Sequence, residues 1–166
     1  SMVDSSIGGK TAINTSEGKN MVGSFYQPKG VLIDPDFLET ISEKEIFSAM
    51  SEVVKYAILF DKNFFSYINK NLEKIISKDK KTLITIIAKC CEFKANIVSL
   101  DEFDNGKRKL LNFGHTFAHA LEFHYKNKIN HGQAVAYGIL FATFCSYKEG
   151  ILSIKLFETI NNFFLK

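Results

Sequence analysis

The sequence predicts a mainly α-helical, multi-helix domain over residues 42–166, preceded by a short glycine-rich segment of loops and strands over residues 1–41. Amphipathic periodicity typical of helices begins near residue 42 and continues to the end of the chain. The first thirty residues lack this periodicity and contain a cluster of turn-forming glycines: Gly8, Gly9, Gly18, Gly23 and Gly30. A length of 166 residues, 46% hydrophobic, is enough for one domain with a sizeable core.

Composition excludes several classes of protein. The 46% hydrophobic and 23% charged residues are ordinary for a globular chain and argue against disorder. A net charge of +3 is too mild, and too dispersed, to predict a nucleic-acid partner. No apolar run approaches the roughly 18 residues of a membrane span, and no secretory signal is visible. The cysteines number three, and Cys90 and Cys91 are adjacent, which favours reduced thiols and a cytoplasmic location.

The end of the glycine-rich segment predicts one short element before the helices. Val31–Ile33 has the pattern of a short buried strand. Asp34 is a good helix cap, and Pro35 suits the first helical position, so a helical turn is expected to start there.

Helix signals then follow one another along the chain. Ser42–Glu45 matches a capping box. The residues behind it recur at helical spacing and predict a buried stripe: Ile46, Ala49, Met50, Val53, Val54 and Ala57. Further helices are expected over residues 62–77, 79–100, 109–126, 131–149 and 153–165, with Asp101–Lys107 as a connecting loop.

The way the chain opens predicts that it is part of something larger. It begins in the middle of a glycine-rich element, and its 16 Phe and 6 Tyr suggest more apolar surface than a chain of this length buries by itself. We therefore expect a piece of a larger protein or a chain that needs a partner surface. A small complete helical domain is the alternative.

One predicted helix carries an unusual polar stripe. Arg108, Asn112, His115 and His119 are spaced by 4, 3 and 4 residues, so they would share a face of the helix expected over 109–126. The opposite face would carry the core stripe: Leu110, Phe113, Phe117 and Leu121. Lysine and glutamate are the usual residues of a solvated face, so this stripe favours a functional site over a polar interface that is merely hydrogen-bonded.

The histidines suggest two kinds of metal site. Histidines four residues apart, as His115 and His119 are, can share a metal. A thermolysin-like peptidase is not supported, because the Glu of its His-Glu-x-x-His signature is replaced by Thr116. Alternatively, an antiparallel helix would bring His131 back beside His115, with Glu52 as a third ligand and a position left open for substrate or water. Spacing leaves both arrangements open.

The glycine turn near the N-terminus predicts an anion contact. The run from Asp4 to Thr11 resembles a phosphate loop, but the nucleoside-triphosphatase pattern needs glycine where Asp4 stands, so that function is rejected. What remains is a turn that exposes backbone N–H groups and directs Lys10 at an anion. A tight turn with a solvated lysine is the alternative.

Several motifs together resemble the 3-dehydroquinate synthase family. They occur in order between residue 2 and about residue 145: Asp4-Ser-Ser-Ile-Gly-Gly-Lys-Thr-Ala-Ile-Asn14, Gly18-Lys-Asn-Met-Val-Gly-Ser-Phe25, Ser51-Glu-Val-Val-Lys-Tyr56, Leu110-Leu-Asn-Phe-Gly-His-Thr-Phe-Ala-His119 and His131-Gly-Gln-Ala-Val135. The wider sugar-phosphate cyclases and the metal-dependent polyol dehydrogenases share the architecture. The resemblance implies an α/β nucleotide-binding domain whose tail is residues 1–41, then a helical metal- and substrate-binding domain over residues 42–166, shortened at its C-terminus. It also implies that this chain alone is inactive, since it lacks the glycine-rich pyrophosphate loop of the family.

The resemblance also implies roles for individual residues. Glu52, His115 and His131 match metal ligands. Three residues match catalytic groups: His119 as a general base, Asp104 where the family commonly carries glutamate, and Lys55. The implied substrate contacts are Asp4, Lys10, Asn20, Lys94, Arg108 and Asn112. The implied NAD contacts are Lys10, Lys19, Phe37, Leu38, Glu39 and Thr40.

The implied reaction converts 3-deoxy-arabino-heptulosonate 7-phosphate to 3-dehydroquinate and phosphate in the shikimate pathway. It implies a zinc or cobalt cation, NAD, a small sugar-phosphate substrate, a homodimer in the intact enzyme, and neither a nucleic-acid nor a membrane partner. Arg108 would hold the substrate carboxylate, or instead cap the 101–107 loop by pairing with Asp101 or Asp104. Another sugar-phosphate cyclase and a non-catalytic helical binding module are the competing functions.

Overall fold

The computed structural model describes residues 1–125 and 128–165 and confirms a mainly helical fold. Contacts within the chain define two compact units. The first, called the hairpin unit, comprises residues 1–40 and 78–109. The second, called the bundle unit, comprises residues 41–77 and 110–166. No helix in the described ranges combines the length and apolar character needed to cross a membrane.

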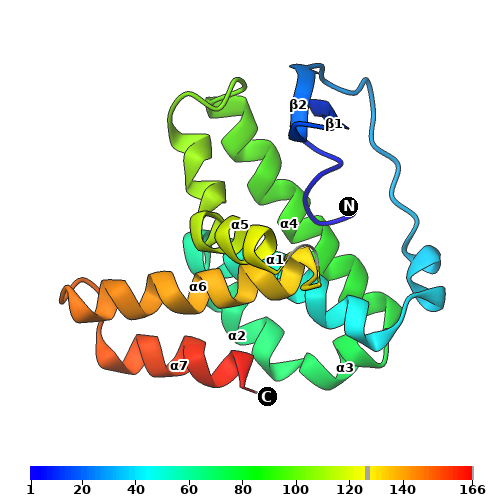
Figure 1. The fold of residues 1–166 in the computed structure, drawn as a ribbon. Coiled ribbons are helices and arrows are strands. Elements are labelled where there is room, and N and C mark those ends of the chain that lie inside the picture. The colour runs from blue at the N-terminus through cyan, green and yellow to red at the C-terminus, as the bar shows by residue number, and fades with distance from the viewer. Residues whose placement is uncertain (126–127, 166) are drawn as a thin grey trace. The chain divides into compact units, whose positions relative to one another are not determined.

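The hairpin unit combines two strands with one long helix. Strands β1 (Lys10–Thr15) and β2 (Gly18–Phe25) pair antiparallel, with Lys10 opposite Phe25. The 3₁₀-helix η1 spans Pro35–Thr40, and α4 spans Lys80–Leu100. The Asp79 side chain caps α4 by accepting from the backbone N–H of Thr82. Figure 1 shows β1 and β2 in blue and α4 in green.

The expected strand at Val31–Ile33 is wrong. These residues belong to no helix or strand, and Leu32 is 98% exposed. Three adjacent apolar residues carry no information on whether a second strand lies beside them, and among the described residues only β1 and β2 pair. The helical turn expected after Asp34 is confirmed, because η1 begins at Pro35 and the Asp34 carboxylate accepts from the backbone N–H of Asp36 at 3.0 Å.

The bundle unit is built around helix α6. Its helices are α1 (Glu43–Phe60), α2 (Lys62–Lys70), α3 (Leu72–Ile76), α5 (His115–His124), α6 (His131–Lys148) and α7 (Ile154–Phe164). Helices α1, α5 and α7 all contact α6, and Figure 1 shows α7 lying along α6. The capping box of Ser42 and Glu45 is confirmed. Of the predicted α1 stripe, Ala49 alone is exposed, and the other five residues are buried.

The helix expected over 109–126 is broken, and the four-residue polar face predicted on it is wrong. Residues Lys107–Asn112 form the 3₁₀-helix η2, and α5 begins only at His115. Gly114 separates the two with a left-handed φ of 79°. Arg108 and Asn112 therefore do not continue the face of α5. The predicted core stripe also fails at Leu110, which is exposed while Leu111 is buried. The helix expected over 62–77 is likewise divided into α2 and α3 at Asn71.

Glycines set how closely α6 approaches its neighbours. A Cβ atom on Gly138 would lie 1.9 Å from the Gly114 carbonyl oxygen, just before α5. A Cβ atom on Gly132 would lie 2.0 Å from the Ser48 carbonyl oxygen on α1. Neither separation is possible for a real side chain, so both positions require glycine. These contacts fix the starts of α5 and α6 against the bundle.

Candidate metal centre

Three potential metal ligands converge in the bundle unit. Glu52 lies in α1 and is 8% exposed, while His115 and His131 are the first residues of α5 and α6. The capping box of Asn130 and Gln133 starts α6 at His131. The left-handed Gly114 starts α5 at His115. Local start signals thus place both imidazoles.

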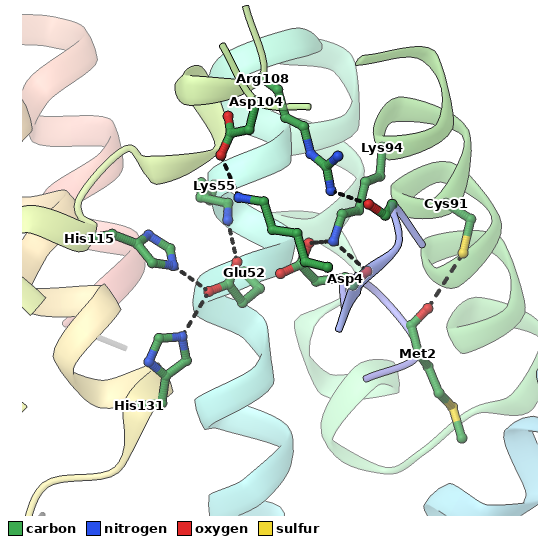
Figure 2. Close-up of polar contacts among 12 residues, drawn as sticks. Met2, Asp4, Glu52, Lys55, Cys91, Lys94, Asp104, Arg108, His115 and His131 are labelled. Carbon is green, nitrogen blue, oxygen red and sulfur yellow. Dashed lines mark hydrogen bonds and ion pairs between the residues drawn. The ribbon is translucent and has the colours of Figure 1, made fainter. Parts of the chain in front are cut away.

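The geometry of the three side chains suits a cation. Figure 2 shows both imidazoles directed at the Glu52 carboxylate. Its Oε1 lies 3.4 Å from His115 Nε2 and 3.5 Å from His131 Nε2, and one ligand atom from each residue lies within 4.8 Å of the others. These contacts are longer than good hydrogen bonds, and the buried Oε1 has no hydrogen bond from a described residue, while Oε2 is paired with the ammonium of Lys55. Two imidazoles and a carboxylate form a donor set that zinc accepts.

The same contacts determine the protonation of Glu52 and His131. Burial alone would raise the pKa of Glu52, but contacts from His115 and His131 and the charge of Lys55 outweigh it, so the pKa lies well below its ordinary value. Contact with Glu52 raises the pKa of His131 above its ordinary value, against the opposite effect of burial and with a further contribution from Glu122. The cluster therefore contains an ionised carboxylate, which favours binding of a cation.

Lys55 and His119 lie beside these ligands. The buried Lys55 Nζ is 2.5 Å from Glu52 Oε2, one turn along α1. His119 lies one turn after His115 on α5, with its ring edge-on to that of His115 at 5.7 Å between centroids. The convergent donors are Glu52, His115 and His131, so of the two arrangements left open by spacing, the structure assembles the one with His131.

The hairpin unit holds two ion pairs among the predicted substrate residues. Lys94 is buried, and its Nζ lies 2.6 Å from both the carbonyl oxygen and Oδ1 of Asp4. Lys10 pairs with Asp104 Oδ2. Asp104 has a left-handed φ of 59°, and its Oδ1 is buried with no hydrogen bond from a described residue. The structure thus brings together Asp4 with Lys94, and Lys10 with Asp104.

Arg108 is anchored on backbone groups. The residue is 2% exposed, and its guanidinium donates to the Glu102 carbonyl at 2.5 Å and to the Gly8 carbonyl at 2.6 Å. Its backbone N–H donates to Asp101 Oδ2 at 2.9 Å. A Cβ atom on Gly8 would lie 2.2 Å from Nη2, so this contact requires glycine. Arg108 therefore contacts the 101–107 loop through the Glu102 carbonyl and through its own backbone N–H to Asp101, and its guanidinium hydrogen bonds go to carbonyls and not to the Asp101 or Asp104 carboxylate of the loop-capping alternative. The substrate role of Arg108 stays a prediction.

The remaining predicted contacts are more exposed. Asn20 has a left-handed φ of 58°, with its backbone N–H bonded to Asn14 Oδ1, and Asn112 lies on the surface of the bundle unit. The four η1 residues predicted to touch NAD, Phe37–Thr40, form one turn in which only Leu38 is partly buried. The side chain of Lys19 lies outside the described part of the chain.

Sequence reasoning missed one residue of this region. Glu122 Oε1 lies 3.4 Å from His131 Nδ1. Its only sequence signal is a position seven residues, or two helical turns, after His115. That spacing places it on the His115 side of α5 but does not predict contact with another helix.

Comparison with known proteins assigns the family. The C-terminal model of 3-dehydroquinate synthase matches residues 49–166, and the N-terminal model of the same enzyme matches residues 1–48. The chain therefore belongs to the 3-dehydroquinate synthase family. The Vibrio atlanticus 3-dehydroquinate synthase is 48% identical over 162 residues, which cover 96% of this chain and 44% of the relative. The enzyme of Buchnera aphidicola subsp. Cinara cedri is 48% identical over 165 residues, covering 98% and 45%. The chain thus spans less than half the length of these relatives.

Solved structures share the fold. A 2-epi-5-epi-valiolone synthase from Streptomyces hygroscopicus subsp. jinggangensis, with NAD⁺ and Zn²⁺ bound, superposes with a TM-score of 0.89 at 23% identity, over 97% of this chain and 45% of that one. A 2-deoxy-scyllo-inosose synthase, complexed with carbaglucose-6-phosphate, NAD⁺ and Co²⁺, gives a TM-score of 0.88 at 26% identity, over 96% and 44%.

Proposed function

We propose that this chain supplies the metal-binding and part of the substrate-binding machinery of a 3-dehydroquinate synthase. The reaction is the NAD- and zinc-dependent conversion of 3-deoxy-arabino-heptulosonate 7-phosphate to 3-dehydroquinate and phosphate. The observation that carries the proposal is the buried Glu52 carboxylate, whose Oε1 lacks a hydrogen bond from the described residues and faces two imidazole Nε2 atoms. Family membership supplies the substrate and the reaction.

The proposed metal site uses three protein side chains, so a four-coordinate zinc ion would have one further position for a substrate oxygen. Glu52, His115 and His131 would hold zinc or cobalt. When bound, such a cation lowers the pKa of a coordinated hydroxyl group and makes its oxidation easier. Lys55, at 2.5 Å from Glu52 Oε2, helps keep the carboxylate ionised for this role. His119, one turn from His115, is the proposed base that takes a proton from the substrate.

Substrate-binding roles are proposed for residues of each unit separately. Lys94 and Arg108 are proposed to hold the substrate carboxylate, since ammonium and guanidinium groups bind carboxylates through charge-assisted hydrogen bonds. Asp4, Lys10, Asn20 and Asn112 are proposed as further contacts. Asp104 has the carboxylate that a proton acceptor needs. Its ion pair with Lys10, another proposed substrate contact, supports this role.

NAD enters the proposal through the relatives alone. The η1 residues Phe37–Thr40, with Lys10 and Lys19, are the proposed contacts. No η1 residue is buried, and only Leu38 of these four is partly covered.

The wider setting is part of the same proposal. It includes a homodimer, a cytoplasmic location, and residues 1–41 as the end of a nucleotide-binding domain. Another sugar-phosphate cyclase is the competing function, favoured by the fold shared with 2-deoxy-scyllo-inosose synthase. The 48% identity to 3-dehydroquinate synthases favours the first choice.

The proposal is tested by metal content and then by substrate choice. Dialysis of the chain against zinc should leave one zinc ion per chain, and Glu52→Gln should lose it. The exposed Glu158, changed to Gln, is the matched control because it removes the same charge elsewhere in the bundle unit. Phosphate release from a panel of sugar phosphates, by the polypeptide extended to the length of its relatives, should be fastest with the heptulosonate phosphate. Faster release from another sugar phosphate would favour the competing cyclase.

A further inference from the structure

We infer that Glu122 is a positioning residue that orients His131 toward the metal. The inference rests on the proposed metal site and adds a residue to it. The Glu122 carboxylate Oε1 lies 3.4 Å from His131 Nδ1, while His131 Nε2 faces Glu52 at 3.5 Å. The two nitrogens of one imidazole ring therefore face two different carboxylates. Figure 2 shows the His131 ring turned so that one nitrogen points at Glu52.

His131 needs such a partner more than His115 does. The His115 side chain is largely enclosed, and its Nδ1 lies 3.2 Å from the Phe113 carbonyl oxygen, a backbone group that holds the ring. The His131 side chain is 52% exposed, so packing alone does not fix its rotation. The Glu122 side chain is 11% exposed and comes from the packed helix α5. The largely buried Glu122 carboxylate can therefore restrain the more exposed His131 ring.

The chemistry of metal-bound histidine explains the arrangement. A histidine that binds a metal through one ring nitrogen usually donates the N–H of the other to a carboxylate or carbonyl. That bond selects the tautomer, fixes the ring plane and makes the coordinating nitrogen more basic. If Nδ1–H donates to Glu122 when a metal is bound, the lone pair of His131 is on Nε2, the atom that faces Glu52. His115, through the Phe113 carbonyl, exposes the lone pair of its Nε2 in the same way.

Helix α5 contributes two residues to the proposed metal site. It contributes His115 at its first residue and Glu122 two turns later. Helix α6 contributes His131 at its own first residue, so the Glu122–His131 contact joins the two helices at the site. A merely structural role for Glu122 as a tie between α5 and α6 predicts a different outcome: lower stability of the metal-free chain with unchanged metal affinity.

The experiment measures metal affinity and metal-free stability separately. The full chain and the variants Glu122→Ala, Glu122→Gln and Glu158→Gln are titrated with Zn²⁺ against a chromophoric chelator. The visible absorption of bound Co²⁺ reports the ligand geometry, and Tm is measured without metal. Glu122→Ala should weaken zinc binding about 10- to 100-fold, the range for loss of such a partner, and should alter the Co²⁺ spectrum. Glu122→Gln keeps the shape and an acceptor oxygen, so its loss should be smaller, and Glu158→Gln should bind as the unchanged chain does.

The outcomes separate this inference from the metal site itself. If the unchanged chain binds no metal, the proposed metal site fails, and Glu122 loses its role with it. If the unchanged chain binds zinc and Glu122→Ala binds it equally well, the site stands and the inference is wrong. Should Glu122→Ala fail to fold, Glu122→Gln decides: affinity and Co²⁺ spectrum both unchanged from those of the unaltered chain would overturn the inference.

Discussion

The hairpin unit and the bundle unit differ in how their buried charged groups are paired. In the hairpin unit, buried cationic groups are satisfied by the unit itself: Lys94 by Asp4, and Arg108 by the carbonyls of Gly8 and Glu102. In the bundle unit, Lys55 pairs with Glu52 Oε2, but the buried Oε1 has only the two imidazole nitrogens at 3.4 and 3.5 Å and no hydrogen bond from the described residues. An unsatisfied buried carboxylate is costly unless something else binds it. The difference indicates that the carboxylate of the bundle unit is placed to receive a cation, whereas the buried cations of the hairpin unit are already paired within it. The hairpin unit also leaves one buried carboxylate oxygen, Asp104 Oδ1, without a hydrogen bond from a described residue.

The largest effect is expected from removing a ligand of the bundle unit. His131→Ala takes one of the three protein donors from the metal and should abolish zinc binding or weaken it severely. His119→Ala, one turn along from a ligand, should keep the zinc and slow turnover by roughly 10²–10⁴, the usual contribution of a general base. Zinc content and turnover of each variant are the measurements. Full zinc occupancy in His131→Ala would remove that residue from the ligand set.

The next effect concerns the packing that positions the ligands. Gly138→Ala places a Cβ atom 1.9 Å from the Gly114 carbonyl oxygen, so α6 must move away from the start of α5. We expect a loss of about 1–3 kcal/mol in the free energy of unfolding, together with weaker zinc binding. Gly30→Ala is the control, since a Cβ atom there meets nothing within 4 Å. Denaturant unfolding and zinc titration of both variants give the comparison. Equal stability in the two would mean that the approach of α6 does not depend on glycine.

Arg108→Lys tests the hydrogen bonds between Arg108 and the carbonyl groups of the hairpin unit. Lysine keeps the charge but loses the planar fork that reaches the carbonyls of Gly8 and Glu102. The free energy of unfolding should fall by about 1.5–3 kcal/mol, while zinc affinity in the bundle unit should not change. In the catalytically complete enzyme, a substrate role also predicts a roughly ten- to hundred-fold drop in kcat/KM. An unchanged kcat/KM with a lowered Tm would make Arg108 structural only.

The smallest effect is the pH dependence of the metal-free bundle unit. The pKa of His131 is raised in the folded state, so its contribution to stability is complete below its ordinary value of 6.5 and is lost as pH rises through the folded pKa. The depressed pKa of Glu52 acts the other way, with stability fully present above its ordinary value of 4.5 and lost progressively as the pH falls below it. Because His131 is half exposed, solvent screening limits its contribution to under about 1 kcal/mol. Unfolding of the metal-free chain from pH 6 upward, with and without His131→Gln, measures it. A slope that the variant leaves unchanged would contradict the assignment.

The sequence predicts local features such as helix caps and buried helical stripes well. The capping box at Ser42 and the stripe behind it predict α1 because each signal acts within a turn or two of helix. The polar stripe of Arg108, Asn112, His115 and His119 fails because helical spacing cannot reveal the left-handed Gly114. Gly114 lies against Gly138 of α6, a contact between two helices that spacing within one helix cannot predict. Family resemblance, and not spacing, singled out Glu52, His115 and His131 together, and neither pointed to Glu122, whose partner is on another helix.

The central claim is that Glu52, His115 and His131 together hold a divalent metal. X-ray absorption at the zinc edge of the zinc-loaded chain tests it most directly, because imidazole and carboxylate ligands scatter differently. The account predicts one zinc per chain with two imidazole nitrogens and oxygen ligands, and a single imidazole in any residual zinc of His131→Ala. Absence of bound zinc, or the same two-imidazole spectrum in His131→Ala, would contradict it.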